Sequence, residues 1–169
     1  MALAIREATV RDYDALCIVV EEVDRAHRHA LPDRFQASAG PARSREYIVD
    51  AVQADDVGLF VAEIGEQVVG LVHTILKDTP ALTVLVPRRY AVVDNLCVLP
   101  AHRRCGVGRA LLTAAEGWAG SRGATSIELT VYAFNQPACD FYTELGFCIL
   151  SHRLTKPLGA PESESLRCA

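Results

Sequence analysis

Hydrophobic positions recur along the chain in short runs separated by turn residues, a pattern that predicts an α/β fold. Residues 57–64 and 68–77 are rich in Val, Ile, Leu and Phe, and Gly65-Glu66 between them suits a two-residue hairpin turn. Helical spacing of apolar residues follows Thr9, which with Asp12 forms a near capping box. The expected strands are 3–8, 57–64, 68–77, 90–98, 125–131 and 147–154, and the expected helices are 9–25, 44–53, 106–120 and 137–145. This order predicts a mixed central sheet of about six strands flanked by about four helices.

The composition fits one soluble domain of ordinary size. Of the 169 residues, 50% are hydrophobic and 22% are charged. We therefore expect a single domain over residues 1–154, followed by a flexible tail over 155–169 that carries Pro, Ser and Glu. The net charge of −4 disfavours a general nucleic-acid binder, which usually has a basic domain.

Two further patterns bear on location. No apolar run approaches a membrane span, and residues 1–11 lack the apolar core of a secretory signal. The six cysteines form no CxxC pair, so neither a zinc site nor a disulfide framework is indicated. We expect a cytoplasmic protein without a bound metal.

The strongest local signal lies where the expected strand 90–98 passes into the expected helix 106–120. A basic loop follows the strand, and the helix opens at Gly106-Val107-Gly108. Helix starts leave N–H groups unpaired and carry a positive dipole, and glycines let an anion approach the backbone. Arg103, Arg104 and Arg109 add positive charge, so the loop predicts a site for a diphosphate.

Two other phosphate-binding loops are disfavoured by the same residues. A P-loop needs Lys-Ser/Thr after its last glycine, and here Arg109-Ala110 follow. A dinucleotide-binding loop needs a third glycine at the position of Leu111, although Glu128 does stand at the spacing of that motif's acidic residue.

Two motifs at a suitable separation resemble those of the GCN5-related N-acetyltransferase (GNAT) family. Arg103-x-x-Gly106-x-Gly108 resembles the family's acyl-CoA signature. Asn135-x-x-Ala138-x-x-Phe141-Tyr142-x-x-x-Gly146-Phe147 looks like its C-terminal motif. The resemblance covers roughly residues 3–154 and implies the GNAT fold. It also implies transfer of an acetyl group from acetyl-CoA to a primary amine, by direct attack with both substrates bound.

The resemblance assigns cofactor-binding roles by position. The diphosphate would sit on the loop and helix start, and the pantetheine arm would pair with the backbone of the preceding strand. The residues implied are Leu96, Cys97, Val98, Arg103, Arg104, Cys105, Gly106, Val107, Gly108 and Arg109. The backbone N–H of Val98 would polarise the thioester carbonyl. The family usually has a bulge that splays this strand from the next, but the sequence does not reveal one.

The same resemblance gives roles to two residues near the C-terminus. Tyr142 aligns with the tyrosine that protonates the departing CoA thiolate, and a phenol is chemically suited to that step. The alternative is a half-buried tyrosine that merely packs. Asn135 either bonds the cofactor or caps the helix that begins near Pro137.

Asp94 is the best candidate for handling the acceptor amine. Alternation places Val92, Asp94, Leu96 and Val98 on one face of the strand and Val93, Asn95, Cys97 and Leu99 on the other. Family members often carry Glu or His at the position of Val92 or Asp94. A carboxylate of ordinary pKa is too weak a base, so burial would have to raise that pKa; otherwise Asp94 binds a cationic substrate or pairs with a nearby arginine.

Other candidates are weaker. His73 suits either a base or a satisfied sheet histidine, and Cys97 suggests a covalent acetyl-enzyme only weakly. By position alone, relatives imply an acceptor site around the first helix and its loop, at Glu21, Glu22, His27, His29 and Arg34. The resemblance leaves homodimerisation open. The alternative function is a GNAT-like domain that binds acyl-CoA as a regulator and transfers nothing.

Overall fold

The computed structural model of the chain describes residues 2–156 and 158. These residues divide into two compact units at the junction between Phe134 and Asn135, and we describe each unit by itself. Residues 157 and 159–169 of the predicted tail lie outside the described residues.

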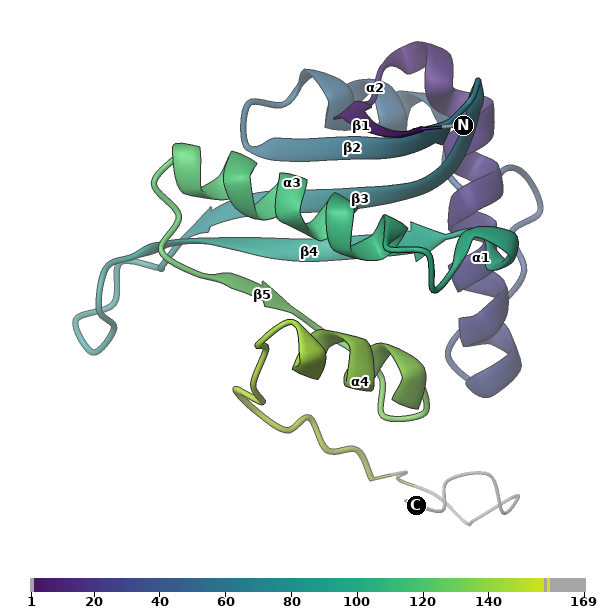
Figure 1. The fold of residues 1–169 in the computed structure, drawn as a ribbon. Helices are drawn as coiled ribbons and strands as arrows, with labels where there is room; N and C mark the ends of the chain where they lie inside the picture. The colour runs from purple at the N-terminus through teal and green to yellow at the C-terminus, as the bar shows by residue number, and fades with distance from the viewer. Residues whose placement is uncertain (1, 157, 159–169) are drawn as a thin grey trace. The chain divides into compact units, whose positions relative to one another are not determined.

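The first unit is built on a five-stranded sheet in the order β1-β2-β3-β4-β5 (Figure 1). The strands are β1 (Leu3–Glu7), β2 (Val57–Ile64), β3 (Gln67–Asp78), β4 (Arg89–Val98) and β5 (Ile127–Leu129). The first four strands pair antiparallel, whereas β4 and β5 pair parallel. The mixed sheet confirms the predicted fold class.

Helices cover both faces of this sheet (Figure 1). On one face lies α3 (Val107–Ser121), which buries Val107, Leu111 and Leu112. On the other lie α1 (Tyr13–Ala30) and α2 (Arg45–Gln53), whose buried side chains form one core cluster with Leu59, Leu71 and Cys97 of the sheet. Gly58 gives α3 room, because a Cβ there would stand 2.7 Å from the Trp118 ring.

Local signals in the sequence account for several element ends. Thr9 and Asp12 form the predicted capping box at a short 3₁₀ helix, Val10–Asp12. The Ser44 hydroxyl accepts from the Tyr47 N–H and caps α2. Gly65 adopts a φ of 66° in the predicted β2–β3 turn. These contacts lie within a few residues of one another, which is why the sequence alone predicted them.

The first helix runs further than its predicted end near residue 25. The mixture of His, Arg, Pro, Ser and Gly over residues 26–42 predicts a loop, but in the structure residues 26–30 continue α1 to Ala30. Arg28 forms an ion pair with Glu21, and Arg25 pairs with Glu22 at 2.7 Å. His27 stacks on Phe35, with 4.9 Å between ring centroids. These contacts along the helix surface compensate for the missing apolar stripe.

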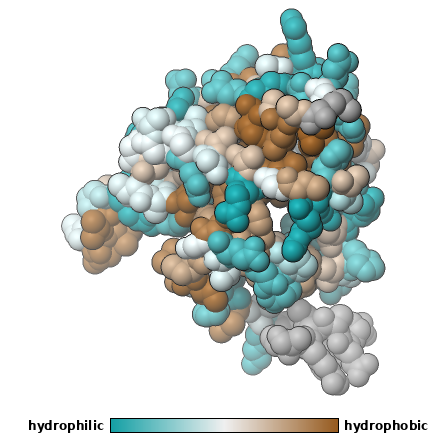
Figure 2. Space-filling model, in the orientation of Figure 1, coloured by the Kyte–Doolittle hydropathy of each residue, from teal (hydrophilic) through white to brown (hydrophobic). Residues whose placement is uncertain are grey.

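The β3–β4 connection projects from the sheet and carries apolar side chains at its tip. Thr79 N–H donates to Arg88 C=O at 2.9 Å and closes the loop at its base. Val84 and Val86 are 85% and 79% exposed. Figure 2 shows hydrophobic side chains gathered at the end of this loop, at the left of the view.

The second unit contains α4 (Gln136–Glu144) but not the predicted strand 147–154. Residues 147–156 have no regular secondary structure, and both Ile149 and Leu150 are 77% exposed. An alternating apolar pattern does not make a strand without a neighbour to receive its backbone hydrogen bonds, and no described residue pairs with this segment. The predicted sixth strand was therefore wrong.

An ion-pair network ties β1 to the start of α1 and gives the fold a pH-dependent contribution. Arg6 contacts Asp12 Oδ1 at 2.8 Å and Glu63 at 2.8 Å, and Asp12 is almost buried. The hydrogen bond from Arg6 holds the pKa of the Asp12 carboxyl at about 2, against the opposing effect of burial. This depressed pKa stabilises the folded state above the unfolded pKa, near pH 4, and the contribution is lost as the pH falls towards 2.

We expect Asp12→Asn to lower the free energy of unfolding by about 1–2 kcal/mol at pH 7, allowing for the solvent that reaches Arg6. The difference from the unmodified protein should shrink between pH 4 and pH 2. Urea unfolding at pH 7 and at pH 3 measures both values. Asp55→Asn, at an exposed loop position, is the control. A difference that stays constant down to pH 2 would contradict this account.

Candidate acyl-transfer site

A bulge interrupts β4 at Asp94. Asn95 pairs with His73 of β3, whereas Val93 pairs with the next residue of β3, Thr74. Asp94 therefore has no partner on β3. Such bulges bend a strand and re-aim a side chain, and they are frequent beside active sites.

The bulge reverses the alternation predicted for β4. Asn95 and Cys97 pair with His73 and Leu71, and Cys97 and Leu71 belong to the core beneath α1 and α2. Val98 pairs with Gly70, whose Cβ position lies 3.1 Å from Leu111 of α3. Asp94 contacts His73 and so belongs with Asn95 on the α1–α2 face. The prediction that Asp94 shares a face with Leu96 and Val98 was wrong, because the alternation count assumed an unbroken strand.

Beyond the bulge, β4 has one edge that no strand of the first unit covers. The β4–β5 ladder ends at the Val93–Leu129 pair. Leu99 N–H donates to Val69 C=O of β3 at 2.9 Å. Because neighbouring residues of a strand direct their backbone groups to opposite sides, Val98 and Leu96 direct theirs away from β3. This edge can take an extended amide-bearing chain by strand-like pairing.

The loop after β4 presents backbone N–H groups to solvent. A 3₁₀ helix, Pro100–His102, turns the chain, and Arg104 then adopts a φ of 62°, in the left-handed region. Gly106 follows with a φ of 82° and stands as the N-cap of α3, without a side chain to bond the first N–H groups. Val107 is buried beneath this helix start and anchors it. The result is an anion site at the positive end of a 15-residue helix.

The side chains of this loop suit a diphosphate. Arg104 and Arg109 are exposed, and neither forms an ion pair with another described residue. Arg103 Nε donates to Val98 C=O at 2.9 Å, which holds the loop against the end of β4. The exposed Cys105 thiol lies 3.3 Å from Arg103 C=O, and Gly108 adds no side chain at the helix start.

The Asp94 carboxylate is half-exposed, and two side chains contact one of its oxygens. Asp94 Oδ2 lies 3.3 Å from His73 Nδ1, and Asn95 Nδ2 donates to the same oxygen at 2.8 Å. Hydrogen bonding to His73 lowers the pKa of the Asp94 carboxyl, and this outweighs the effect of burial. The carboxyl is therefore an anion near neutral pH, which suits ionic contact with an ammonium group better than removal of its proton.

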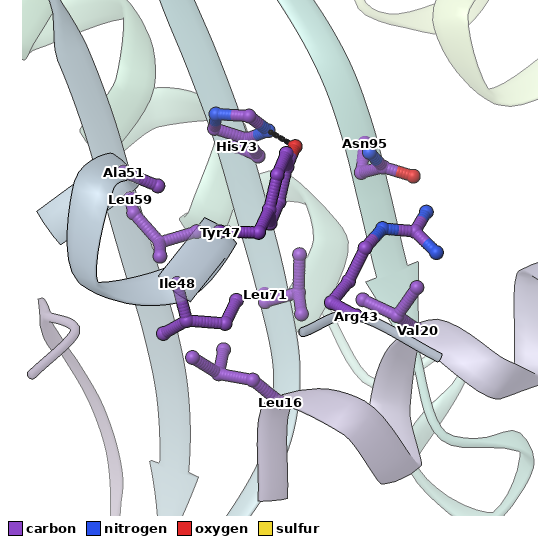
Figure 3. Close-up of a pocket in the computed structure, with 10 residues that line it drawn as sticks. All are labelled: Leu16, Val20, Arg43, Tyr47, Ile48, Ala51, Leu59, Leu71, His73 and Asn95. Carbon is purple, nitrogen blue, oxygen red and sulfur yellow. Dashed lines mark hydrogen bonds between the residues drawn. The ribbon is translucent and has the colours of Figure 1, made fainter. Parts of the chain in front are cut away.

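The structure adds two residues that the sequence analysis did not single out. Tyr47 and Arg43, from α2 and the segment before it, line a hollow of about 20 Å³ together with His73 and Asn95 (Figure 3). Arg43 Nη1 is bonded to Asp24 of α1 at 2.8 Å. Tyr47 stands among apolar residues at helical spacing, so only the contact of its hydroxyl with β3 distinguishes it. The hollow holds about one water molecule and is too small for a substrate.

Cys97 lies among buried side chains of the α1–α2 face. Its exposure is 1%, and burial raises the pKa of its thiol to about 12. A thiol of such high pKa provides almost no thiolate at neutral pH, so a covalent acetyl-enzyme at this residue is disfavoured.

Tyr142 and Asn135 both lie in the second unit. The Asn135 side chain accepts from Ala138 N–H at 3.3 Å, so it caps α4, one of the two roles expected for it. The Tyr142 ring lies 5.3 Å from that of Phe141 and 5.6 Å from that of Phe147. The role of Tyr142 as an acid stays a prediction.

The residues expected by position around the first helix are largely occupied by contacts within the first unit. Glu21 and Glu22 pair with arginines of the same helix. His27 packs in an aromatic cluster with Phe35, Tyr132 and Phe134, and burial lowers the pKa of its imidazole. His29 and Arg34 are exposed. An acceptor-binding role for these residues stays a prediction.

Within the described residues, no group of three or more His, Cys, Asp or Glu side chains is arranged to hold a metal ion. None of the helices described is both long and apolar enough to cross a membrane.

Comparison with known proteins identifies the family. The model of the acetyltransferase (GNAT) family matches residues 20–147, and the chain belongs to this family. An uncharacterised N-acetyltransferase of Methanocaldococcus jannaschii is 33% identical over 62% of this chain and 45% of its own. An N-alpha-acetyltransferase of Sulfurisphaera tokodaii is 28% identical over 76% of this chain and 74% of its own. A streptothricin acetyltransferase of Escherichia coli is 30% identical over 66% of this chain and 59% of its own. The match thus spans less than two thirds of two of these relatives.

A solved structure agrees over most of the chain. A mutant of a Bacillus halodurans protein superposes with a TM-score of 0.88 and 29% identity, covering 92% of this chain and 99% of that one. The family predicted from the two motifs is confirmed.

The buried state of Cys97 gives a direct test of its chemistry. In the native protein at pH 8 we expect iodoacetamide to modify the exposed Cys105 and Cys148 and to leave Cys97 unmodified, because only about one thiol in ten thousand with a pKa of 12 is ionised there. Peptide mass spectrometry measures the modification, with urea-unfolded protein as the positive control. Rapid modification of native Cys97 would restore it as a candidate nucleophile.

Proposed function

We propose that this protein is an acyl-CoA-dependent N-acetyltransferase that moves the acetyl group of acetyl-CoA to a primary amine while both substrates are bound. The observation that carries the proposal is the continuity of two features: the edge of β4 that is open beyond the bulge, and the loop and helix start that follow it. A pantetheine arm and a diphosphate occur in that order on CoA. Family membership and the names of the relatives support the same reaction.

The backbone would bind the acyl donor. Leu96 and Val98 would pair with the pantetheine amides, and the N–H groups from Arg104 to Arg109 would receive the diphosphate. Val98 N–H would donate to the thioester oxygen as negative charge develops there during attack. Arg103 Nε takes one lone pair of the Val98 carbonyl, so this oxygen can still accept from a pantetheine amide while the Val98 N–H serves the thioester.

Asp94 would bind the acceptor as its ammonium ion. The pKa of an ordinary primary amine lies about 3.4 units above pH 7. Removing the proton from its ammonium ion at that pH therefore costs roughly 4.6 kcal/mol. Asp94 cannot supply this as a base because its pKa is lowered, so the proton would leave through water. The attacking nitrogen then displaces the CoA thiolate, and Tyr142 would give that thiolate a proton.

The acceptor class is the primary amine of a small molecule or of a protein. The names of two relatives, an N-alpha-acetyltransferase and a streptothricin acetyltransferase, support an amine acceptor. The anionic Asp94 favours a cationic amine in either case. Action in the cytoplasm and as a homodimer stays a prediction.

The donor site predicts selective stabilisation by CoA. At about 100 times its dissociation constant, acetyl-CoA or CoA should stabilise the protein by roughly 2.7 kcal/mol, a shift of several degrees, whereas NADH should give none. Gly106→Ala should weaken CoA binding about five- to tenfold, because a side chain at a φ of 82° costs about 1–2 kcal/mol and moves the N–H groups. Gly117→Ala, at an open position of α3, should bind CoA normally. A shift with NADH, or none with CoA, would contradict the donor site.

The acceptor contact predicts a selective loss in an Asp94 variant. We expect Asp94→Asn to reduce acetyl transfer at least tenfold, mainly through the KM of the amine, and to leave acetyl-CoA affinity unchanged. Thiol release from acetyl-CoA with spermine, a peptide with a free N-terminus and streptothricin as acceptors measures the rates. Unchanged turnover would remove Asp94 from the mechanism. Thiol release that stays at background with the unmodified protein, despite CoA binding, would favour a regulatory acyl-CoA binder.

A further inference from the structure

The polar contacts behind Asp94 converge on one nitrogen of a buried imidazole. His73 Nδ1 lies 3.3 Å from Asp94 Oδ2 and 3.4 Å from Tyr47 Oη. These three side chains come from β3, β4 and α2, and Figure 3 shows the Tyr47 hydroxyl directed at the His73 ring. The His73 side chain is 7% exposed, whereas that of Asp94 is 48% exposed. The buried imidazole therefore contacts one side of the Asp94 carboxylate, whose other side faces solvent.

The two nitrogens of His73 have unequal surroundings. Nε2 is buried and has no hydrogen-bond partner among the described residues. Leaving such a polar atom unpaired costs free energy, so a histidine kept only for packing would be better replaced by an apolar residue. All of the polar contacts of this ring are at Nδ1, on the side of Asp94 and Tyr47.

The chemistry of a carboxylate fixes which atom carries the hydrogen. An ionised carboxylate only accepts hydrogen bonds, so contact with Asp94 requires the hydrogen on Nδ1. Asp94 also lies at the bulge, where no residue of β3 pairs with it and holds its backbone. The direction of its side chain therefore depends on His73 and on Asn95.

We propose that His73, seated against Tyr47, is the positioning residue that fixes the Asp94 carboxylate toward the ammonium group of the acceptor. This inference rests on the proposed transferase function and names how its acceptor site is held. His73 would act through Asp94 alone and would touch neither substrate. Arg43, which also lines this hollow, is paired with Asp24 at 2.8 Å, and its positive charge adds to the lowering of the Asp94 pKa.

A pair of substitutions separates the two nitrogens. Asparagine carries its amide nitrogen at the δ position, as far along the side chain as Nδ1, whereas glutamine carries it at the ε position. We expect His73→Gln to raise the KM of the acceptor amine about tenfold and to leave the KM of acetyl-CoA within about twofold, since one hydrogen bond to a charged group is lost. His73→Asn should recover most of the acceptor KM. His152→Gln, at an exposed position, is the matched control and should change neither value.

A double-mutant cycle tests whether His73 acts through Asp94. In the Asp94→Asn background, His73→Gln should have no further effect on the acceptor KM. Additive effects, or equal effects of His73→Gln and His73→Asn, would overturn the proposal. The thermal shift with CoA is measured for every variant. If the CoA-induced shift of His73→Gln is normal but its acceptor KM is unchanged, the positioning role of His73 is wrong, whereas the proposed donor site is still supported.

A measurement that needs no acceptor makes the proposal falsifiable even if no probe amine reacts. In the ¹⁵N-labelled full-length protein with CoA, imidazole NMR correlations report which nitrogen carries the hydrogen, and the His73 signals are those that disappear in His73→Gln. We expect the Nδ1–H form at pH 8 and its loss in Asp94→Asn. An Nε2–H form in the unmodified protein would overturn the proposal directly.

Discussion

The bulge at Asp94 divides β4 into two stretches with different neighbours. From Ala91 to Val93 the strand is paired on both sides, to β3 and to β5. From Leu96 onwards it keeps only β3, and its other edge is free within the first unit. The extra residue also moves Asn95 to the face of α1 and α2, although Val93 stays on the face of α3. The exposed carboxylate and its contact with His73 depend on this one insertion in the β3–β4 ladder, and the open edge begins directly beyond it, where the β4–β5 ladder has ended.

The features around the bulge are individually unfavourable and are held by the rest of the unit. A buried imidazole with one unpaired nitrogen, a non-glycine residue in the left-handed region at Arg104 and an uncapped helix start at Gly106 each cost stability. His73 lies beside core residues of α1 and α2, and the buried Val107 anchors the start of α3. Strain concentrated at one end of a strand, and compensated by packing elsewhere, is typical of sites that must stay open to a ligand.

The parts of the fold that the sequence predicted depend on contacts between near neighbours. The Thr9–Asp12 capping box, the Ser44 cap and the Gly65-Glu66 turn are each determined by residues within a few positions. The anion loop could be predicted for the same reason, since its glycines and arginines adjoin one another. The bulge could not, because it is a mismatch between two strands and leaves no mark on either sequence. Strand 147–154 was predicted wrongly for the converse reason, since alternation alone does not supply a partner.

The candidate site likewise combines features that the local sequence predicts with features that depend on contacts between distant segments. Asp94 was singled out from its position in a strand, but the direction of its pKa shift was not predictable from that strand. The shift comes from His73, and His73 is in turn contacted by Tyr47, which is 26 residues away along the chain. Only the folded arrangement shows that the carboxyl is made more acidic rather than less. The sequence therefore pointed to the residue and left two roles open for it, and the lowered pKa favours ionic contact with the acceptor over the role of a base.

This division suggests how one scaffold serves different acceptors. The donor would be held by backbone groups of β4 and of the helix start, which most side chains allow and which need only Gly106 and Gly108 at fixed places. The acceptor would be held by side chains that converge from α2, β3 and β4, and each of these can change without disturbing the donor loop. Relatives named as an N-alpha-acetyltransferase and as a streptothricin acetyltransferase, both recognisably similar to this chain, fit that separation. In the proposed mechanism, the surroundings of Asp94 would determine which acceptor binds, and they are the part of the site that the shared motifs do not include.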